Sequence, residues 1–209
     1  MTRWLILVKH SLPTLEPGIP AHLWQLSPTG KQRCTGLAQQ LSAYLPFRLY
    51  SSTEPKATQT AALVASQLHI PWQTHPGLHE HERSQVGFSS PAQFQANMRL
   101  FFEHPTQTVF GGESADQAYQ RFSTALQVLL DADSPHAQNL MAQNLVVVAH
   151  GTVISLYVAR RCGLEAYPLW EQLGLPAFIR LDFPIELEQH CQVGDPIDIF
   201  NPYYPGAPV

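Results

Sequence analysis

Two apolar runs constrain the fold of this chain more than any other feature of its sequence. Residues 4–8 are Trp-Leu-Ile-Leu-Val and residues 145–149 are Leu-Val-Val-Val-Ala, with no polar residue inside either run. Strands of this kind are buried on both faces and are typical of parallel sheets covered by helices. Each run leads into a histidine, His10 after Lys9 and His150 before Gly151.

Helix and strand signals alternate around these two runs. Ser27 before Pro28, and Pro55 in a first turn, are typical of helix starts. Helices are predicted over 30–44, 55–69 and 153–161, and further strands over 47–51, 71–75, 177–183 and 185–191. Residues 79–140 are polar, with a break at Gly111-Gly112, and predict two or three inserted helices. Proline and glycine in the last ten residues predict an irregular tail.

This order of elements predicts one α/β domain over residues 1–209. We expect a three-layer fold in which a mostly parallel central sheet has helices on both faces, with a helical insertion at 79–140.

Composition excludes several classes of protein. The formal net charge of −4 argues against general nucleic-acid binding, which needs a basic field. The three cysteines (Cys34, Cys162 and Cys191) are widely spaced and indicate free thiols in a reducing compartment. No stretch resembles a signal peptide or the roughly 18 apolar residues of a membrane span. We therefore predict a soluble cytoplasmic protein without membrane or nucleic-acid partners.

The two strand-end histidines and one misplaced lysine indicate a ligand site. Ligands bind at the carboxyl ends of parallel strands, so His10 and His150 are expected to face one crevice, although each could also be a structural histidine. Lys56 lies in the first turn of the helix predicted at 55–69, where the helix dipole favours anions. Lys56 either points to water beside Glu54 or binds an anion together with the helix amides.

These residues suggest a phosphate pocket. A neutral imidazole can attack phosphorus and carry the phosphoryl group. A second, protonated imidazole would stabilise charge on the phosphoryl oxygens, and a nearby acid would protonate the leaving alkoxide.

The sequence resembles the histidine phosphatase superfamily, also called the phosphoglycerate mutase-like family. Several motifs carry the resemblance, in the family's order over roughly residues 4 to 183. They are Lys9-His10-Ser11, Leu26-Ser27-Pro28-Thr29-Gly30, the segment from Ser51 to Ala61 (SSTEPKATQTA), Leu78-His79-Glu80, Gly112-Glu113-Ser114 and His150-Gly151.

The resemblance implies roles for individual residues. It implies that His10 is the phosphorylated nucleophile, His150 the second pocket histidine and Glu80 the proton donor, with Glu82 as its nearest rival. Lys9, Lys56, Ser11, Gly151 and Arg83 are the expected phosphate-binding residues. Segment 79–140 would form a lid that selects the substrate.

The implied activity is hydrolysis of a small phosphorylated metabolite without a cofactor or a metal. Mutase-type phosphoryl transfer is an alternative within the family, and a homodimer is left open. The sequence His79-Glu80-His81-Glu82 lacks the two-histidine helical spacing of a zinc motif.

Three positions depart from the family pattern. Lys9 and Lys56 stand where the family has arginine, and Ser11 stands where it has glycine. Lysine keeps the charge but lacks the planar fork that grips two phosphate oxygens. The hydroxyl of Ser11 could donate to phosphate, and Arg83 could supply a guanidinium or simply pair with Glu80 on a helix. These changes leave a second hypothesis open, a pseudo-enzyme that binds a phosphorylated ligand without turnover.

Overall fold

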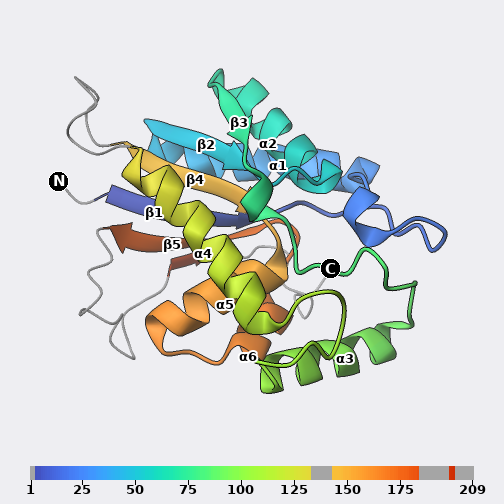
Figure 1. Ribbon diagram of the computed structural model, residues 1–209. Coiled ribbons are helices and arrows are strands. Elements are labelled where there is room, and N and C mark those ends of the chain that lie inside the picture. Colours follow the sequence, from blue (N-terminus) through green and yellow to red (C-terminus); the bar gives the residue numbers. More distant parts are fainter. Residues whose placement is uncertain (1–2, 133–142, 184–197, 201–209) are drawn as a thin grey trace.

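The centre of the protein is a six-stranded sheet in the order β3-β2-β4-β1-β5-β6 (Figure 1). The computed structural model describes residues 3–132, 143–183 and 198–200. The strands are β1 (Arg3–Lys9), β2 (Phe47–Ser51), β3 (Trp72–Thr74), β4 (Asn144–Ala149), β5 (Ala177–Phe183) and β6 (Asp198–Phe200). Strands β3, β2, β4 and β1 are parallel to one another, whereas β5 is antiparallel to β1 and to β6. The predicted mostly parallel sheet is confirmed.

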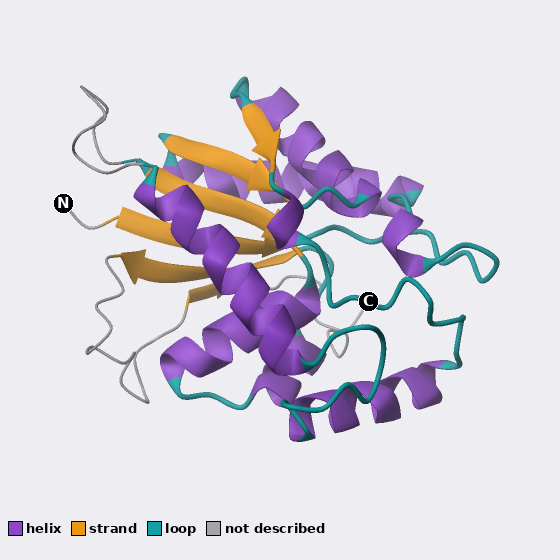
Figure 2. Ribbon diagram, in the orientation of Figure 1, coloured by secondary structure: helices purple, strands orange, loops and turns teal. Residues whose placement is uncertain are grey.

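Helices cover both faces of this sheet (Figure 2). The helices α1 (Pro28–Leu41) and α2 (Pro55–Leu68) lie on one face. The helices α4 (Ala115–Asp131) and α5 (Gly151–Cys162) lie on the other, α6 (Ala166–Gln172) packs beside α5, and α3 (Pro91–Glu103) packs beside α6, away from the sheet (Figure 1). Short 3₁₀ turns occur at Ala21–Leu23, Ser42–Tyr44 and Pro76–Leu78. The three-layer α/β fold predicted from the sequence is therefore present.

The apolar runs divide the core into two layers. Successive side chains of a strand point to opposite faces, so Leu5 and Leu7 join the cluster beneath α4 and α5. Ile6 and Val8 join the second cluster, beneath α1 and α2. All four side chains are fully buried, as the unbroken apolar pattern predicts.

The region predicted as an insertion is less uniform than expected. Its second helix, α4, buries Phe122 and Leu126 in the same cluster as Val147 of β4, so this helix belongs to the layer on the sheet. The part beside the site comprises α3 and the irregular segments 79–90 and 104–114. Residues 133–142 of the insertion lie outside the described residues.

Other predictions meet the structure only in part. The strand predicted at 185–191 and, apart from Phe200, the predicted tail lie outside the described residues. The sequence patterns missed α6 and β6. Within the described ranges, no helix has both the length and the apolar character needed to cross a bilayer.

The loop after β1 is locked to the start of α1. Ser27 caps α1 by accepting a hydrogen bond from Gly30 N at 3.0 Å, and Ser27 N donates to Leu12 O at 3.0 Å. A β-carbon on Gly30 would lie 2.0 Å from Leu12 O, so only glycine allows this close approach. This contact between Gly30 and Leu12 fixes the path of the loop that follows His10.

We expect Gly30→Ala to lower the free energy of unfolding by about 2–3 kcal/mol, because two backbone segments must separate to accept the methyl group. Denaturant unfolding measures this change. Gly18→Ala is the matched control: nothing lies within 4 Å of its added carbon, so its effect should stay within about 0.5 kcal/mol. Equal midpoints for the two variants would contradict this account of the loop.

Candidate active site

The pairing of β1 with β4 brings the two strand-end histidines together. Lys9 lies opposite Ala149 in the ladder, and His10 N extends the ladder by donating to Ala149 O at 3.0 Å. The rings of His10 and His150 then meet edge to face, with centroids 5.2 Å apart. The two histidines are therefore adjacent at this edge of the sheet, but only His10 lines the cavity described below.

His10 is held as a neutral imidazole with one free nitrogen. Burial, followed by the neighbouring His150 and Lys56, holds its pKa well below the usual value. Its Nδ1 lies 2.8 Å from the carbonyl oxygen of Ser11 and can only donate to it, so the ring proton is on Nδ1. The lone pair of Nε2 therefore remains available for a nucleophilic attack.

His150 is fully buried and also neutral. Burial and the charge of Lys56 hold its pKa well below the usual value. Its Nε2 lies 2.8 Å from Ser52 Oγ, which already accepts a hydrogen bond from Glu54 N at 3.2 Å. His150 Nδ1 has no hydrogen-bond partner in the described part of the chain. The lowered pKa favours a neutral imidazole where the sequence analysis expected a protonated one.

Glu80 is the carboxylate on the wall of the site. It accepts hydrogen bonds from His81 N at 2.9 Å and Thr152 N at 3.4 Å, and it lies 4.0 Å from a guanidinium nitrogen of Arg83. Burial raises its pKa, but Arg83, His150 and the His81 amide together outweigh burial, and the net pKa is lowered. The rival, Glu82, points to a neighbouring recess, where Ser84 N and Oγ both donate to it.

Arg121 positions the segment that carries Glu80, and the sequence analysis missed it. From α4, its guanidinium donates to the carbonyls of Gly77, His79 and Glu80 at 3.0, 2.9 and 3.1 Å. Glu113, from the Gly-Glu-Ser motif, pairs with Arg121 at 2.5 Å and accepts from Glu82 N at 2.9 Å. No local pattern separates Arg121 from an ordinary charge on the polar face of an amphipathic helix.

Lys9 lies at the floor of the site beside Gly151. Its ammonium donates to Leu173 O at 2.7 Å, and burial lowers its pKa to about 8, with Glu80 opposing the shift. A β-carbon on Gly151 would lie 3.1 Å from Lys9 Cε and 3.4 Å from both Lys9 Nζ and a carbon of Trp170. The glycine therefore leaves room for this ammonium next to the N-terminus of α5.

Lys56 is buried and paired, so neither of its sequence-based interpretations is complete. Its ammonium donates to Glu54 Oε2 at 2.5 Å and to Ala21 O at 2.8 Å, and its side chain is only 6% exposed. Glu54 Oε1 also accepts from Glu80 N at 2.8 Å and lies 3.6 Å from His150 Nε2. The sequence analysis missed Glu54 as a member of the site.

Two expected phosphate ligands differ from their predicted geometry. Ser11 is fully buried, and its hydroxyl donates to Gly30 O at 2.7 Å, so we no longer expect this hydroxyl to bind phosphate. Arg83 follows Glu80 on an irregular segment rather than on a helix. Its guanidinium carbon lies 5.0 Å from the ring centre of Phe94.

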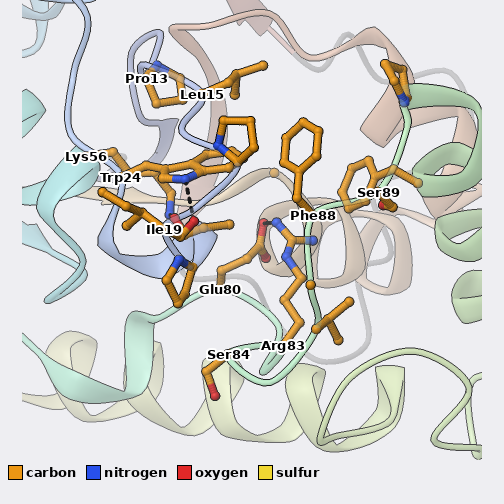
Figure 3. A pocket seen from close by; sticks show the side chains of 18 of the residues that line it. Pro13, Leu15, Ile19, Trp24, Lys56, Glu80, Arg83, Ser84, Phe88 and Ser89 are labelled. Carbon is orange, nitrogen blue, oxygen red and sulfur yellow. Dashed lines mark hydrogen bonds and ion pairs between the residues drawn. The ribbon is translucent and has the colours of Figure 1, made fainter.

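These side chains border one cavity of about 560 Å³ (Figure 3). Its lining includes six of the predicted site residues: Lys9, His10, Lys56, Glu80, Arg83 and Gly151. His150 lies behind His10, and Ser11 is engaged elsewhere. Among the described residues, no group of histidine, cysteine and acidic side chains could hold a metal ion. His81, the neighbour of Glu80, instead packs its ring 4.1 Å from that of Phe101.

Comparison with known families identifies this arrangement. A profile described as the histidine phosphatase superfamily (branch 1) matches residues 22–182. The chain belongs to the histidine phosphatase superfamily. No curated protein matches it significantly.

Solved structures share the superfamily fold. A mycobacterial glucosyl-3-phosphoglycerate phosphatase has a TM-score of 0.69 and 24% identity, covering 87% of this chain and 91% of its own. An Entamoeba histolytica phosphoserine phosphatase has a TM-score of 0.66 and 19% identity over 85% and 90% of the two chains. A putative alpha-ribazole-5'-P phosphatase of Escherichia coli has a TM-score of 0.64 and 21% identity over 95% and 96%.

Lys9 should make anion binding by this superfamily member dependent on pH. The pKa of Lys9 is about 8, so its charge is present below pH 8 and is lost above it. We expect the affinity for sulfate, whose own charge is constant in this range, to fall above pH 8 by up to about tenfold per pH unit. Calorimetric titration between pH 6 and 10 measures this.

Lys9→Arg should retain its affinity to higher pH, because an arginine stays protonated. Lys31→Arg, on an exposed helical position, should behave like the wild type. Parallel pH profiles for the wild type and Lys9→Arg would exclude Lys9 as the titrating group.

Glu54 should stabilise the fold and oppose anion binding at the same time. In Glu54→Gln the buried ammonium of Lys56 loses its counter-ion, so we expect the free energy of unfolding to fall by about 2–4 kcal/mol. The loss of a negative charge should also strengthen sulfate binding several-fold. The exposed Glu103→Gln changes the net charge equally and should alter neither quantity. Weaker sulfate binding in Glu54→Gln would instead show that Glu54 is needed to position Lys56.

Proposed function

We propose that the protein is a phosphomonoester hydrolase that works through a phosphohistidine on His10. The observation that carries the proposal is the state of His10, a neutral ring whose Nδ1 is held by Ser11 O and whose Nε2 is free. Three cations, Lys9, Lys56 and Arg83, lie around the same cavity, with Glu80 as the carboxyl group. A nucleophile, an acid and an anion-binding set are the components that phosphoryl transfer requires.

The names of similar structures support the same activity. The three structures described above are named as phosphatases of glucosyl-3-phosphoglycerate, phosphoserine and alpha-ribazole-5'-P, all small phosphorylated compounds. We therefore propose a small phosphorylated metabolite as substrate of this chain. No metal or cofactor is part of the proposed reaction.

In the first step, His10 Nε2 attacks phosphorus and the bond between phosphorus and the ester oxygen breaks. Glu80 gives its proton to the leaving oxygen, so the alcohol departs neutral. Because the pKa of Glu80 is lowered, the proton enters with the substrate, as the monoanion of the phosphate ester. Lys9 and Arg83, which line the cavity, would stabilise the charge on the phosphoryl oxygens. His150, which packs edge to face against His10, would help to hold that ring in place.

In the second step, water attacks the phosphorus of phosphohistidine. Glu80, now a carboxylate, takes the proton of the water while the bond from phosphorus to Nε2 breaks. Glu80 passes this proton to the phosphate, which leaves as dihydrogen phosphate, so Glu80 is again a carboxylate. His10 returns to its neutral form with the proton still on Nδ1. The hydrogen bond from Nδ1 to Ser11 O keeps the ring in the same tautomer throughout.

A non-catalytic binder of a phosphorylated ligand is the second candidate. The pairing of Lys56 with Glu54 favours it, because one of the two lysines that replace arginine is already neutralised by a carboxylate. A binder, however, requires neither a free imidazole nitrogen nor a buried acid beside it. We therefore rank hydrolysis first, ahead of binding and of mutase-type transfer.

Incubation with phosphate esters should release inorganic phosphate between pH 5 and 8. The reaction should not be quenched with acid, because phosphohistidine is acid-labile. We expect His10→Ala to lose release by at least about a thousandfold. Glu80→Gln should slow esters of poor leaving groups most, since they need the proton. His104→Ala, at an exposed position, should retain wild-type rates.

The phosphoprotein should be detected in rapid-quench experiments under alkaline conditions and should be absent in His10→Ala. Sulfate binding without phosphate release from any ester would favour the binder. Conversion of one phosphoglycerate isomer into the other, faster than its hydrolysis, would favour the mutase.

A further inference from the structure

The cavity is charged at one end and apolar over most of its remaining wall. The side chains that could bind phosphate gather at the floor, as described above. The outer wall is built from three separate segments: Pro13, Leu15, Ile19 and Trp24 from the loop after β1, Val86, Phe88 and Phe94 from the segment after Glu80, and Trp170 and Leu175 from the region of α6. A volume of about 560 Å³ is typical of sites for whole small molecules, so a phosphate alone would leave the apolar part empty.

The cations of the cavity are all gathered near the reacting end. Among the described residues that line the cavity, the cationic side chains are Lys9, Lys56 and Arg83. Lys56 pairs with Glu54, and Arg83 lies beside Glu80. Beyond them the described part of the lining has no charged side chain to pair with a second carboxylate or an ammonium group of a ligand; its polar side chains are Ser84, Gln85 and Ser89. A charged group would lose hydration there without an opposite charge to compensate.

Large apolar side chains are exposed around the mouth of this cavity. Phe88 is 54% exposed, Leu15 61% and Ile19 39%. All three line the cavity and therefore form one apolar rim, whereas the other exposed large apolar side chains of the described residues lie outside its wall. Surface of this kind is typical of a ligand-binding groove.

Trp24 and Phe88 both line the cavity and lie near Glu80 and Arg83 (Figure 3). The indole nitrogen of Trp24 donates to Glu16 O at 3.1 Å and Ile19 O at 2.9 Å. Its polar edge is therefore satisfied by its own loop, which leaves the ring carbons to the cavity. Flat apolar groups pack well against aromatic rings.

From these observations we infer that the preferred substrate is the phosphate ester of an uncharged, apolar alcohol that carries an aromatic ring, with the ring against the apolar wall that includes Trp24 and Phe88. This inference rests on the proposed phosphatase function and names its substrate class. Esters with a second charged group are poor ligands of the same wall, because no further charged side chain lines it in the described part of the chain.

Three aryl esters with leaving groups of similar acidity test the inference: phenyl, naphthyl and carboxyphenyl phosphate. The second ring of the naphthyl ester buries more apolar area, so its kcat/KM should exceed that of the phenyl ester by about tenfold. The added carboxylate should lower kcat/KM by about tenfold or more. Equal or faster turnover of the carboxyphenyl ester would overturn the inference.

Variants separate the apolar wall from the reacting groups. Phe88→Ala should reduce the preference for naphthyl over phenyl phosphate to about twofold, mainly through KM. Leu23→Ala removes another exposed side chain of the same loop as Trp24, but one outside the cavity wall, and should retain the full preference. A preference that is unchanged in Phe88→Ala would exclude this wall as the recognition element.

Equilibrium binding distinguishes failure of this inference from failure of the proposed function. Dissociation constants of the three esters for His10→Ala, measured by calorimetry, should follow the same order, naphthyl tighter than phenyl and phenyl tighter than carboxyphenyl. That order without phosphate release by the wild type would refute hydrolysis and retain the apolar ligand class. Phosphate release from all three esters at similar rates, without that order in binding, would retain hydrolysis and refute the ligand class.

Discussion

The parallel pairing of β1 with β4 is the interaction on which the site depends. It places the ends of two strands that are distant in the sequence side by side. The hydrogen bond from His10 N to Ala149 O extends the ladder to His10, the proposed nucleophile. The two imidazoles are in contact because both histidines directly follow the ends of these paired strands. Glu80, Lys56 and Arg83 are then brought to this edge by segments that pack around it.

Burial controls the chemistry of this edge through charge. Both histidines are neutral because an apolar interior disfavours a second positive charge beside Lys56. Lys56 can remain buried because Glu54 pairs with it. The pKa of Glu80 is lowered despite its burial, because Arg83 and the His81 amide stabilise its carboxylate form. The lysines therefore supply positive charge to the pocket, but at Lys9 that charge can be lost within an accessible pH range because its pKa is lowered to about 8.

Local patterns predicted most of the fold and part of the site. The apolar runs, the proline at helix starts and the serine before Pro28 act within a few residues, so their strands and helices were found in the sequence. Glu54 and Arg121 were missed because their partners are distant or lie across a turn. The hydroxyl of Ser11 was assigned to phosphate because only packing reveals its bond to Gly30.

The sequence by itself determined a covered, mostly parallel sheet with a histidine at the end of each of two central strands, since burial on both faces requires those apolar runs. Only the tertiary structure decided which charges share the pocket: Lys56 with Glu54, Arg83 with Glu80, and Lys9 beside Gly151. It also decided that three separate segments form one apolar wall. The hydrophobic periodicity of the sequence indicates which side chains are buried. Which charged side chains pair depends on distances in the folded chain, and no local sequence pattern contains these.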